Sequence, residues 1–138
     1  MIVTLVQYVS WDEIDSLVEI LSNRISKSSR IFSSISTLSR GGLVPSRLLA
    51  DHLGIEKIIV DPTKISSDSL VVDDIYDTGD TFENIKSKTD NPAKLCYVTL
   101  FARRGKSYPS QLTYGEKTND GGYVVFPWDK LEFERLQK

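Results

Sequence analysis

The chain has 138 residues, of which 40% are apolar and 26% are charged. This length and composition are typical of one compact globular domain that can bury a real core. With a net charge of −2, nothing suggests a surface for nucleic acid, and no apolar run approaches the roughly 20 residues that span a membrane. Because the start lacks a signal-peptide pattern and the chain has a single cysteine, we expect a cytoplasmic protein without an internal disulfide.

The first half of the chain predicts two helices separated by a strand. Ser10–Glu13 has the pattern of a capping box, and apolar residues at helical spacing follow it, so a helix is expected from about residue 11 to 25. Residues 30–38 are predicted to form a strand. A second helix is expected at about 44–53, where Gly54 would end it.

The second half predicts further strands and one more helix. We expect strands at 57–60, 70–75, 94–101 and 123–126, and a helix at about 80–88. This order predicts one α/β domain over residues 1–138, with a mainly parallel twisted sheet and helices on both faces, and a core at about 10–101. The tail from about 102 to 138 breaks the pattern, so we expect it to form a small hood together with part of the N-terminus.

Two adjacent acids, Asp73 and Asp74, stand where a buried apolar strand leaves the sheet. Their repulsion and burial cost free energy unless ribose hydroxyls or a hydrated Mg²⁺ ion compensates them. The loop 77–81, Asp-Thr-Gly-Asp-Thr, then enters a helix, where backbone N–H groups and threonine hydroxyls favour a phosphate. The segment therefore offers a diol site followed by a phosphate site, as ribose 5-phosphate requires. A buried strand end with a capped helix is the alternative.

A second loop, 39–46, has the sequence Ser-Arg-Gly-Gly-Leu-Val-Pro-Ser. Arg40 could grip a phosphate with two N–H groups, and the two glycines free the backbone to turn its amides inward. If the predicted strands adopt the order 2-1-3-4, this loop and the acidic strand end are neighbours at the switch point of the sheet, where ligands bind. The alternative is an ordinary strand-to-helix turn with a surface arginine.

These two segments resemble those of a known family. Residues 69–81 resemble the thirteen-residue phosphoribosyl-pyrophosphate (PRPP) signature of the type I phosphoribosyltransferases, with Asp80 as the one unusual residue. Residues 39–46 resemble the pyrophosphate loop of the bacterial xanthine-guanine phosphoribosyltransferases, where the pair matching Ser39–Arg40 often has a cis peptide bond. The C-terminal run 123–129, Tyr-Val-Val-Phe-Pro-Trp-Asp, resembles the segment that holds the base in 6-oxopurine enzymes.

The resemblance implies a role for each site residue. The ribose phosphate of PRPP would be bound by Asp73, Asp74, Asp77, Thr78, Gly79, Asp80 and Thr81, and the pyrophosphate by Ser39, Arg40 and Gly41. The base would be held by Arg103, Tyr123, Val124 and Asp129, with Tyr123 stacked on the ring. Mg²⁺ would be held, directly or through water, by Asp73, Asp74 and Asp129. Relatives often carry a lysine at the position of Arg103, and the planar arginine fork has a different reach.

By the same resemblance, the chain is a purine phosphoribosyltransferase. It would transfer phosphoribosyl from PRPP to N9 of hypoxanthine, guanine or xanthine, and release a nucleoside monophosphate and pyrophosphate. Asp77 is the candidate for exchanging a proton with N7 of the purine. The expected partners are these small molecules and further copies of the chain, in a homodimer or homotetramer, with no nucleic acid and no membrane.

The chain departs from the family between its second and third predicted strands. Relatives usually have a long mobile loop there that closes over the site, whereas this chain has only the nine residues 61–69. Closure would then come from residues 104–120, from a neighbouring subunit, or not at all. This departure leaves open a non-catalytic sensor of PRPP or nucleotide. A phosphoribosyltransferase for another base, such as adenine or a pyrimidine, is the third alternative.

Overall fold

The main sheet of the computed structural model, which describes residues 5–137, has five parallel strands. Their spatial order is β3 (Ile58–Val60), β2 (Ser34–Thr37), β4 (Ser69–Tyr76), β5 (Tyr97–Ala102) and β6 (Leu112–Lys117). Each neighbouring pair is parallel. The expected adjacency of the first and third core strands, β2 and β4, is therefore confirmed, and their carboxyl ends meet at the switch point of the sheet.

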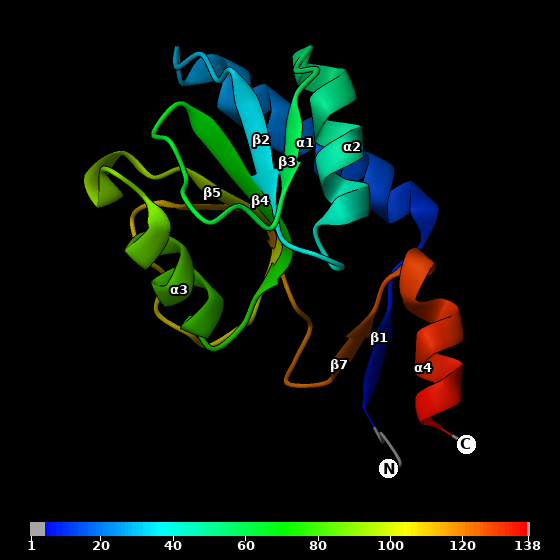
Figure 1. The fold of residues 1–138 in the computed structure, drawn as a ribbon. Coiled ribbons are helices and arrows are strands. Elements are labelled where there is room, and N and C mark those ends of the chain that lie inside the picture. The colour runs from blue at the N-terminus through cyan, green and yellow to red at the C-terminus, as the bar shows by residue number, and fades with distance from the viewer. Residues whose placement is uncertain (1–4, 138) are drawn as a thin grey trace.

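Helices cover both faces of this sheet, as expected (Figure 1). Helices α1 (Trp11–Lys27) and α2 (Leu43–Leu53) pack on one face and α3 (Asp80–Lys88) on the other, and a short 3₁₀ turn, η1 (Pro92–Lys94), precedes β5. The capping box of α1 is confirmed, because the Ser10 hydroxyl accepts from the Glu13 N–H at 3.2 Å and the Glu13 carboxylate accepts from the Ser10 N–H at 3.3 Å. Gly54 ends α2 in the left-handed conformation at φ 69°.

Each face of the sheet has its own apolar cluster. Leu70, Val72 and Val98 pack beneath α1 and α2, while Val71 and Tyr97 pack toward α3. Side chains of alternate strand residues point to opposite faces, so the nearly continuous apolar runs of β4 and β5 fill both clusters. None of the helices within residues 5–137 is long and apolar enough to cross a membrane.

The hood lies beyond the carboxyl ends of the main strands (Figure 1). It contains a two-stranded parallel sheet of β1 (Val6–Tyr8) and β7 (Tyr123–Val125), a 3₁₀ turn, η2 (Pro127–Asp129), and helix α4 (Lys130–Leu136). The Tyr123 N–H donates to the Leu5 carbonyl and the Val9 N–H to the Val125 carbonyl, both at 2.9 Å. The N-terminal strand β1 thus pairs with the C-terminal part of the chain in the hood.

The main sheet extends further along the chain than expected. Strand β6 lies in the range that we assigned to the hood, but it pairs in parallel with β5 and closes one edge of the main sheet. Its half-exposed, mostly polar residues gave no strand pattern. Gly115 in its middle permits close packing, because a Cβ there would lie 2.8 Å from both the Leu100 carbonyl and a Leu17 side chain of α1.

The segment that replaces the usual long loop is short and attached to the body of the molecule. It runs from residue 61 to 68, between β3 and β4. Ile65 is buried, and its N–H donates to the Lys88 carbonyl at 2.9 Å at the end of α3. The expectation of a short turn is confirmed. The segment is held at its start, where the Asp61 N–H donates to the Thr37 carbonyl at 2.9 Å, and in its middle by Ile65.

Candidate active site

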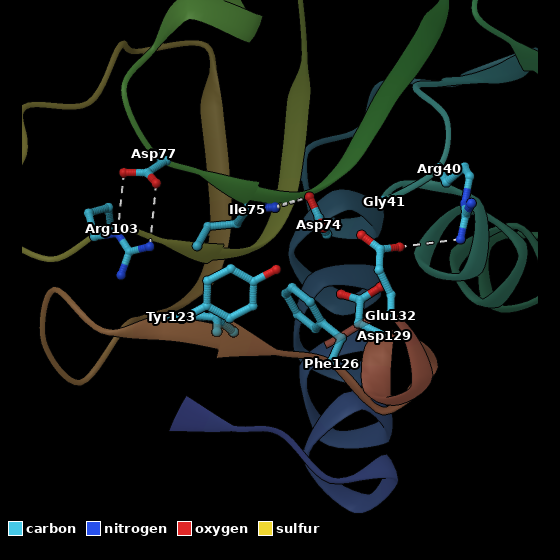
Figure 2. Close-up of a pocket in the computed structure, with 11 residues that line it drawn as sticks. Arg40, Gly41, Asp74, Ile75, Asp77, Arg103, Tyr123, Phe126, Asp129 and Glu132 are labelled. Atoms are coloured by element: carbon cyan, nitrogen blue, oxygen red, sulfur yellow. Dashed lines mark hydrogen bonds and ion pairs between the residues drawn. The ribbon is translucent and has the colours of Figure 1, made fainter. Parts of the chain in front are cut away.

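One cavity lies between the carboxyl ends of the strands and the hood (Figure 2). Its volume is about 460 Å³, which suits a small-molecule ligand. The lining residues come from the loop after β2, the end of β4, the loop after each of β4 and β5, and the hood: Arg40, Gly41, Asp74, Ile75, Asp77, Arg103, Tyr123, Val124, Phe126, Asp129 and Glu132. Eight of these eleven were predicted as site residues; Ile75, Phe126 and Glu132 were not.

The two adjacent acids at the end of β4 have different environments. Asp74 lines the cavity, and one of its oxygens accepts from the Ile75 N–H at 2.8 Å. Asp73 does not line the cavity; it is buried and accepts from the Tyr97 hydroxyl at 3.2 Å. The alternation of side chains along a strand explains this separation. The structure therefore brings Asp74, but not Asp73, to the cavity.

Burial dominates the electrostatics of this acidic pair. It raises the pKa of Asp74 to about 7, with a further contribution from the neighbouring Asp73 carboxylate. The pKa of Asp73 is also raised by burial, although hydrogen bonds from Asp74 and Tyr97 oppose the change. A ligand that offered hydroxyl donors or a cation to Asp74 would replace the solvation that this carboxylate has lost.

The loop after β2 approaches Asp74 closely. A Cβ at Gly41 would lie 2.5 Å from the Asp74 carboxylate, and one at Gly42 would lie 2.7 Å from the Val72 carbonyl. Both glycines therefore permit contact between the loop and β4. The Ser39–Arg40 peptide is cis. Ser39 points its donors elsewhere, because its N–H donates to Asp61 at 2.9 Å and its hydroxyl also donates to that carboxylate.

Arg40 is held by an acid that the sequence analysis missed. Its Nη2 lies 3.3 Å from Glu132 Oε2 of α4, and the two side chains are 82% and 55% exposed. The ion pair crosses from the loop to the hood (Figure 2). The sequence signal was weak, since Glu132 lies in a run of mixed charges. Only its spacing of three residues from Asp129 would place the two acids on one face of a helix.

The loop after β4 turns tightly into α3. Gly79 has φ 93°, where a residue with a side chain would be strained, and a Cβ there would lie 2.9 Å from the Tyr76 hydroxyl. The Asp80 N–H donates to the Thr78 hydroxyl at 3.2 Å. Thr78, Asp80 and Thr81 are exposed and lie outside the cavity lining, so of this loop only Asp77 reaches the cavity. The other predicted phosphate contacts surround the first turn of α3.

Asp77 is paired with Arg103, which follows β5. Arg103 Nε donates to Asp77 Oδ1 at 3.2 Å and Nη2 donates to Oδ2 at 3.4 Å (Figure 2). Nη1 donates to two carbonyls of the segment before β7, at 2.8 Å for Gly122 and 3.2 Å for Asp120. The proposed proton-exchanging group and the proposed base contact are thus in direct contact in this structure.

Aromatic rings form the hood side of the cavity. Tyr123 is 37% exposed, and its ring lies 5.4 Å from that of Phe133. Phe126 is buried and stacks on Trp128 at 4.9 Å with nearly parallel planes, so Trp128 packs within the hood. Asp129 lies beside them, and partial burial, then the nearby Asp74 carboxylate, raise its pKa. An exposed tyrosine face above a polar cavity floor is suited to a flat ring.

The carboxylates suit a metal ion that arrives with a ligand. Among residues 5–137, no group of three or more His, Cys, Asp or Glu side chains is arranged to hold a metal by itself. Asp74 and Asp129 both line the cavity. Mg²⁺ commonly uses one or two carboxylates together with substrate phosphates and water, so these two residues fit such an ion. Asp73 fits less well, because its carboxylate faces Tyr97.

Known proteins share both the sequence pattern and the architecture. The chain is 28% identical to the xanthine-guanine phosphoribosyltransferase of Chromohalobacter salexigens, over 88% of this chain and 82% of that protein. It is 26% identical to the protein of the same name from Desulfotalea psychrophila, over 88% of this chain and 84% of that protein. No family model matches the chain.

Solved structures share the fold. A purine phosphoribosyltransferase from Pyrococcus horikoshii superposes with a TM-score of 0.69 at 22% identity, over 89% of this chain and 93% of that one. The Helicobacter pylori xanthine-guanine-hypoxanthine phosphoribosyltransferase gives a TM-score of 0.74 at 17% identity, over 96% and 99%. The chain has the type I phosphoribosyltransferase fold. The phosphoribosyltransferase resemblance expected from residues 39–46 and 69–81 is confirmed at the level of fold and homologues.

Proposed function

We propose that the chain is a purine phosphoribosyltransferase that transfers phosphoribosyl from PRPP to N9 of a 6-oxopurine. One observation carries the proposal: the loop after β2, the end of β4 and an aromatic hood converge on a single cavity. These three parts match the pyrophosphate, ribose and base of the two substrates. The homologues named xanthine-guanine phosphoribosyltransferase support hypoxanthine, guanine or xanthine as the base.

In the proposed complex, each part of the substrates faces a different part of the site. Arg40 and the backbone at Gly41 would hold pyrophosphate, and Asp74 would accept the ribose hydroxyls. The 5-phosphate would lie at loop 77–81, where the helix N-terminus and the hydroxyls of Thr78 and Thr81 offer donors. The base would stack on Tyr123, with the backbone of Val124 and the region of Asp129 at its edge.

The reaction breaks the bond between C1′ and the pyrophosphate oxygen, which leaves with the electron pair. The bond between C1′ and N9 forms, and the proton on N7 of the purine passes to the Asp77 carboxylate. Arg40 stabilises the negative charge that develops on the leaving group, and Tyr123 holds the ring in line with C1′. Asp74 and Asp129 are the residues that would hold Mg²⁺, whose chemistry when bound is to neutralise charge on pyrophosphate.

The short segment 61–68 favours a second candidate, a binding protein for PRPP or nucleotide without turnover. It is anchored by Ile65 and Asp61 and is too short to cover the cavity. Asp77, Arg40 and the aromatic hood are nevertheless present in the cavity, which favours the enzyme. The cytoplasmic location and a homodimer or homotetramer stay predictions.

The test is an assay with PRPP, Mg²⁺ and hypoxanthine, guanine, xanthine or adenine in turn. We expect a nucleoside monophosphate and an equal amount of pyrophosphate with at least one 6-oxopurine and much less with adenine. Nucleotide binding without product from any base would favour the binding protein. Product with adenine or a pyrimidine base alone would favour the third alternative.

A further inference from the structure

Arg103 makes more contacts than a base-reading residue requires. Its side chain is only 14% exposed, and its guanidinium donates to four oxygens. Two belong to the Asp77 carboxylate and two are the carbonyls of Asp120 and Gly122. An arginine has five N–H groups, so these contacts use four of them.

The backbone of Arg103 is equally constrained. Its N–H donates to the Tyr76 carbonyl at 2.7 Å, and its carbonyl accepts from the Tyr108 hydroxyl at 2.6 Å. Tyr108 itself packs on Tyr76, with ring centroids 5.8 Å apart. The side chain therefore extends from a backbone position, just after β5, that is held at both its N–H and its carbonyl.

The guanidinium connects two parts of the site that are far apart in sequence. Asp77 belongs to the loop between β4 and α3, and Asp120–Gly122 lead into β7 of the hood. One edge of the planar group faces the carboxylate, and Nη1 faces the hood carbonyls. A lysine at this position has one nitrogen on a flexible stem and could not hold the carboxylate through two donors while holding both carbonyls.

We propose that Arg103 is a positioning residue, which orients Asp77 and fixes the hood to the loop after β4. This inference rests on the proposed function and assigns Arg103 a role other than reading the base. Since segment 61–68 is too short to cover the cavity, the hood lies over it, and Arg103 joins the segment before β7 to Asp77. Each carboxylate oxygen has two acceptor positions, so Asp77 keeps the capacity to accept a proton while it is bound to Arg103.

The inference is tested with Arg103→Lys in the full-length chain, with Arg104→Lys as the matched control. Arg104 is the next residue, and its guanidinium donates to the Thr118 carbonyl at 2.8 Å instead of to Asp77. For Arg103→Lys we expect kcat to fall about tenfold or more with every accepted base and by similar factors, because one charge-assisted bidentate contact is lost. We expect backbone hydrogen exchange to become faster at residues 77–79 and at 120–123. The control should keep the wild-type kcat and the wild-type exchange at 77–79.

Asp77→Asn provides a second approach that keeps the arginine and adds no bulk. It weakens one half of the contact, so exchange at residues 120–122 should become faster although Asp77 does not touch them. The double variant should lose little more kcat than the stronger single variant, because both changes act on the same contact. If the wild type forms no nucleotide, the proposed function fails and the exchange result alone decides the inference.

Two results would overturn the inference. In the first, Arg103→Lys leaves hydrogen exchange unchanged at both segments but changes the ratio of kcat/KM between hypoxanthine, guanine and xanthine. That result would mean that Arg103 contacts the base and determines base selectivity. The other is unchanged exchange at 120–122 in Asp77→Asn, which would show that the hood does not depend on the contact.

Discussion

Gly41 lies directly against the carboxylate of Asp74, at a distance that leaves no room for a side chain. A Cβ at Gly41 would be 2.5 Å from Asp74 Oδ2. We expect Gly41→Ala to displace Asp74 or the loop, at a cost of about 1–3 kcal/mol in unfolding free energy, and to weaken PRPP binding about tenfold. Calorimetry with PRPP and Mg²⁺ measures the binding. Gly121→Ala is the control, because a Cβ there meets nothing within 4 Å. Equal PRPP affinity in the two variants would contradict the close approach.

The raised pKa of Asp74 predicts a pH dependence of stability. Since burial places its pKa at about 7 in the folded protein, against 3.8 for an ordinary aspartate, the folded state binds more protons between these pH values. The unfolding free energy should fall as the pH rises from about 4 to 7.

Asp74→Asn should reduce this slope and be more stable than wild type at pH 8, by about 2 kcal/mol. Urea unfolding from pH 4 to 8 measures the slope, and the exposed Asp15→Asn should leave it unchanged. A slope equal to wild type in Asp74→Asn would rule out Asp74 as its source.

The Arg40–Glu132 ion pair predicts competition with pyrophosphate. Glu132 occupies a donor of Arg40 and adds negative charge to the cavity, so Glu132→Gln should bind PRPP about three to ten times more tightly at low salt. The thermal midpoint should change little, because exposed ion pairs contribute little to stability. Glu134→Gln, on the same helix but outside this cavity, is the matched control. Weaker PRPP binding in Glu132→Gln would instead mean that this carboxylate holds the metal or the ligand.

Asp77 is the predicted site of proton exchange. Asp77→Asn keeps the shape of the side chain and an acceptor for Arg103, but it cannot take a proton from N7. We expect kcat to fall about 100-fold or more, with nucleotide affinity changed only a few-fold. Single-turnover kinetics separates the two quantities, and Asp90→Asn, two residues beyond the end of α3, controls for the loss of one negative charge. Wild-type turnover in Asp77→Asn would exclude this role.

Tyr123 is the predicted stacking surface for the base. Its ring rests on Phe133 at 5.4 Å and lines the cavity. Tyr123→Ala should raise the KM for the base about tenfold, while Tyr123→Phe should keep it, because stacking needs the ring and not the hydroxyl. Tyr8 also contacts Phe133, at 6.1 Å, but lies outside the cavity lining, so Tyr8→Ala is the control. An equal change of KM in the two alanine variants would indicate a general effect on the hood.

Local patterns predicted much of the fold. The capping box before α1, the left-handed Gly54 after α2 and the apolar runs of β4 and β5 each depend on residues near one another in sequence. Strand β6 was not predicted, because it is a half-exposed edge strand. Its pairing with β5 depends on a neighbour that the local sequence does not specify.

The sequence by itself determined the two ligand-binding segments, 39–46 and 69–81, because their glycines, acids and threonines are contiguous and their chemistry depends on spacing along the chain. Only the tertiary structure decided which acid of the pair faces the cavity, since the path of β4 turns Asp74 inward and Asp73 toward Tyr97. It also decided the partners of the two arginines. Arg40 pairs with Glu132 on α4, and Arg103 pairs with Asp77 after β4 and with the Gly122 carbonyl before β7. Such pairs join residues up to 92 positions apart, and packing between the core and the hood brings them together.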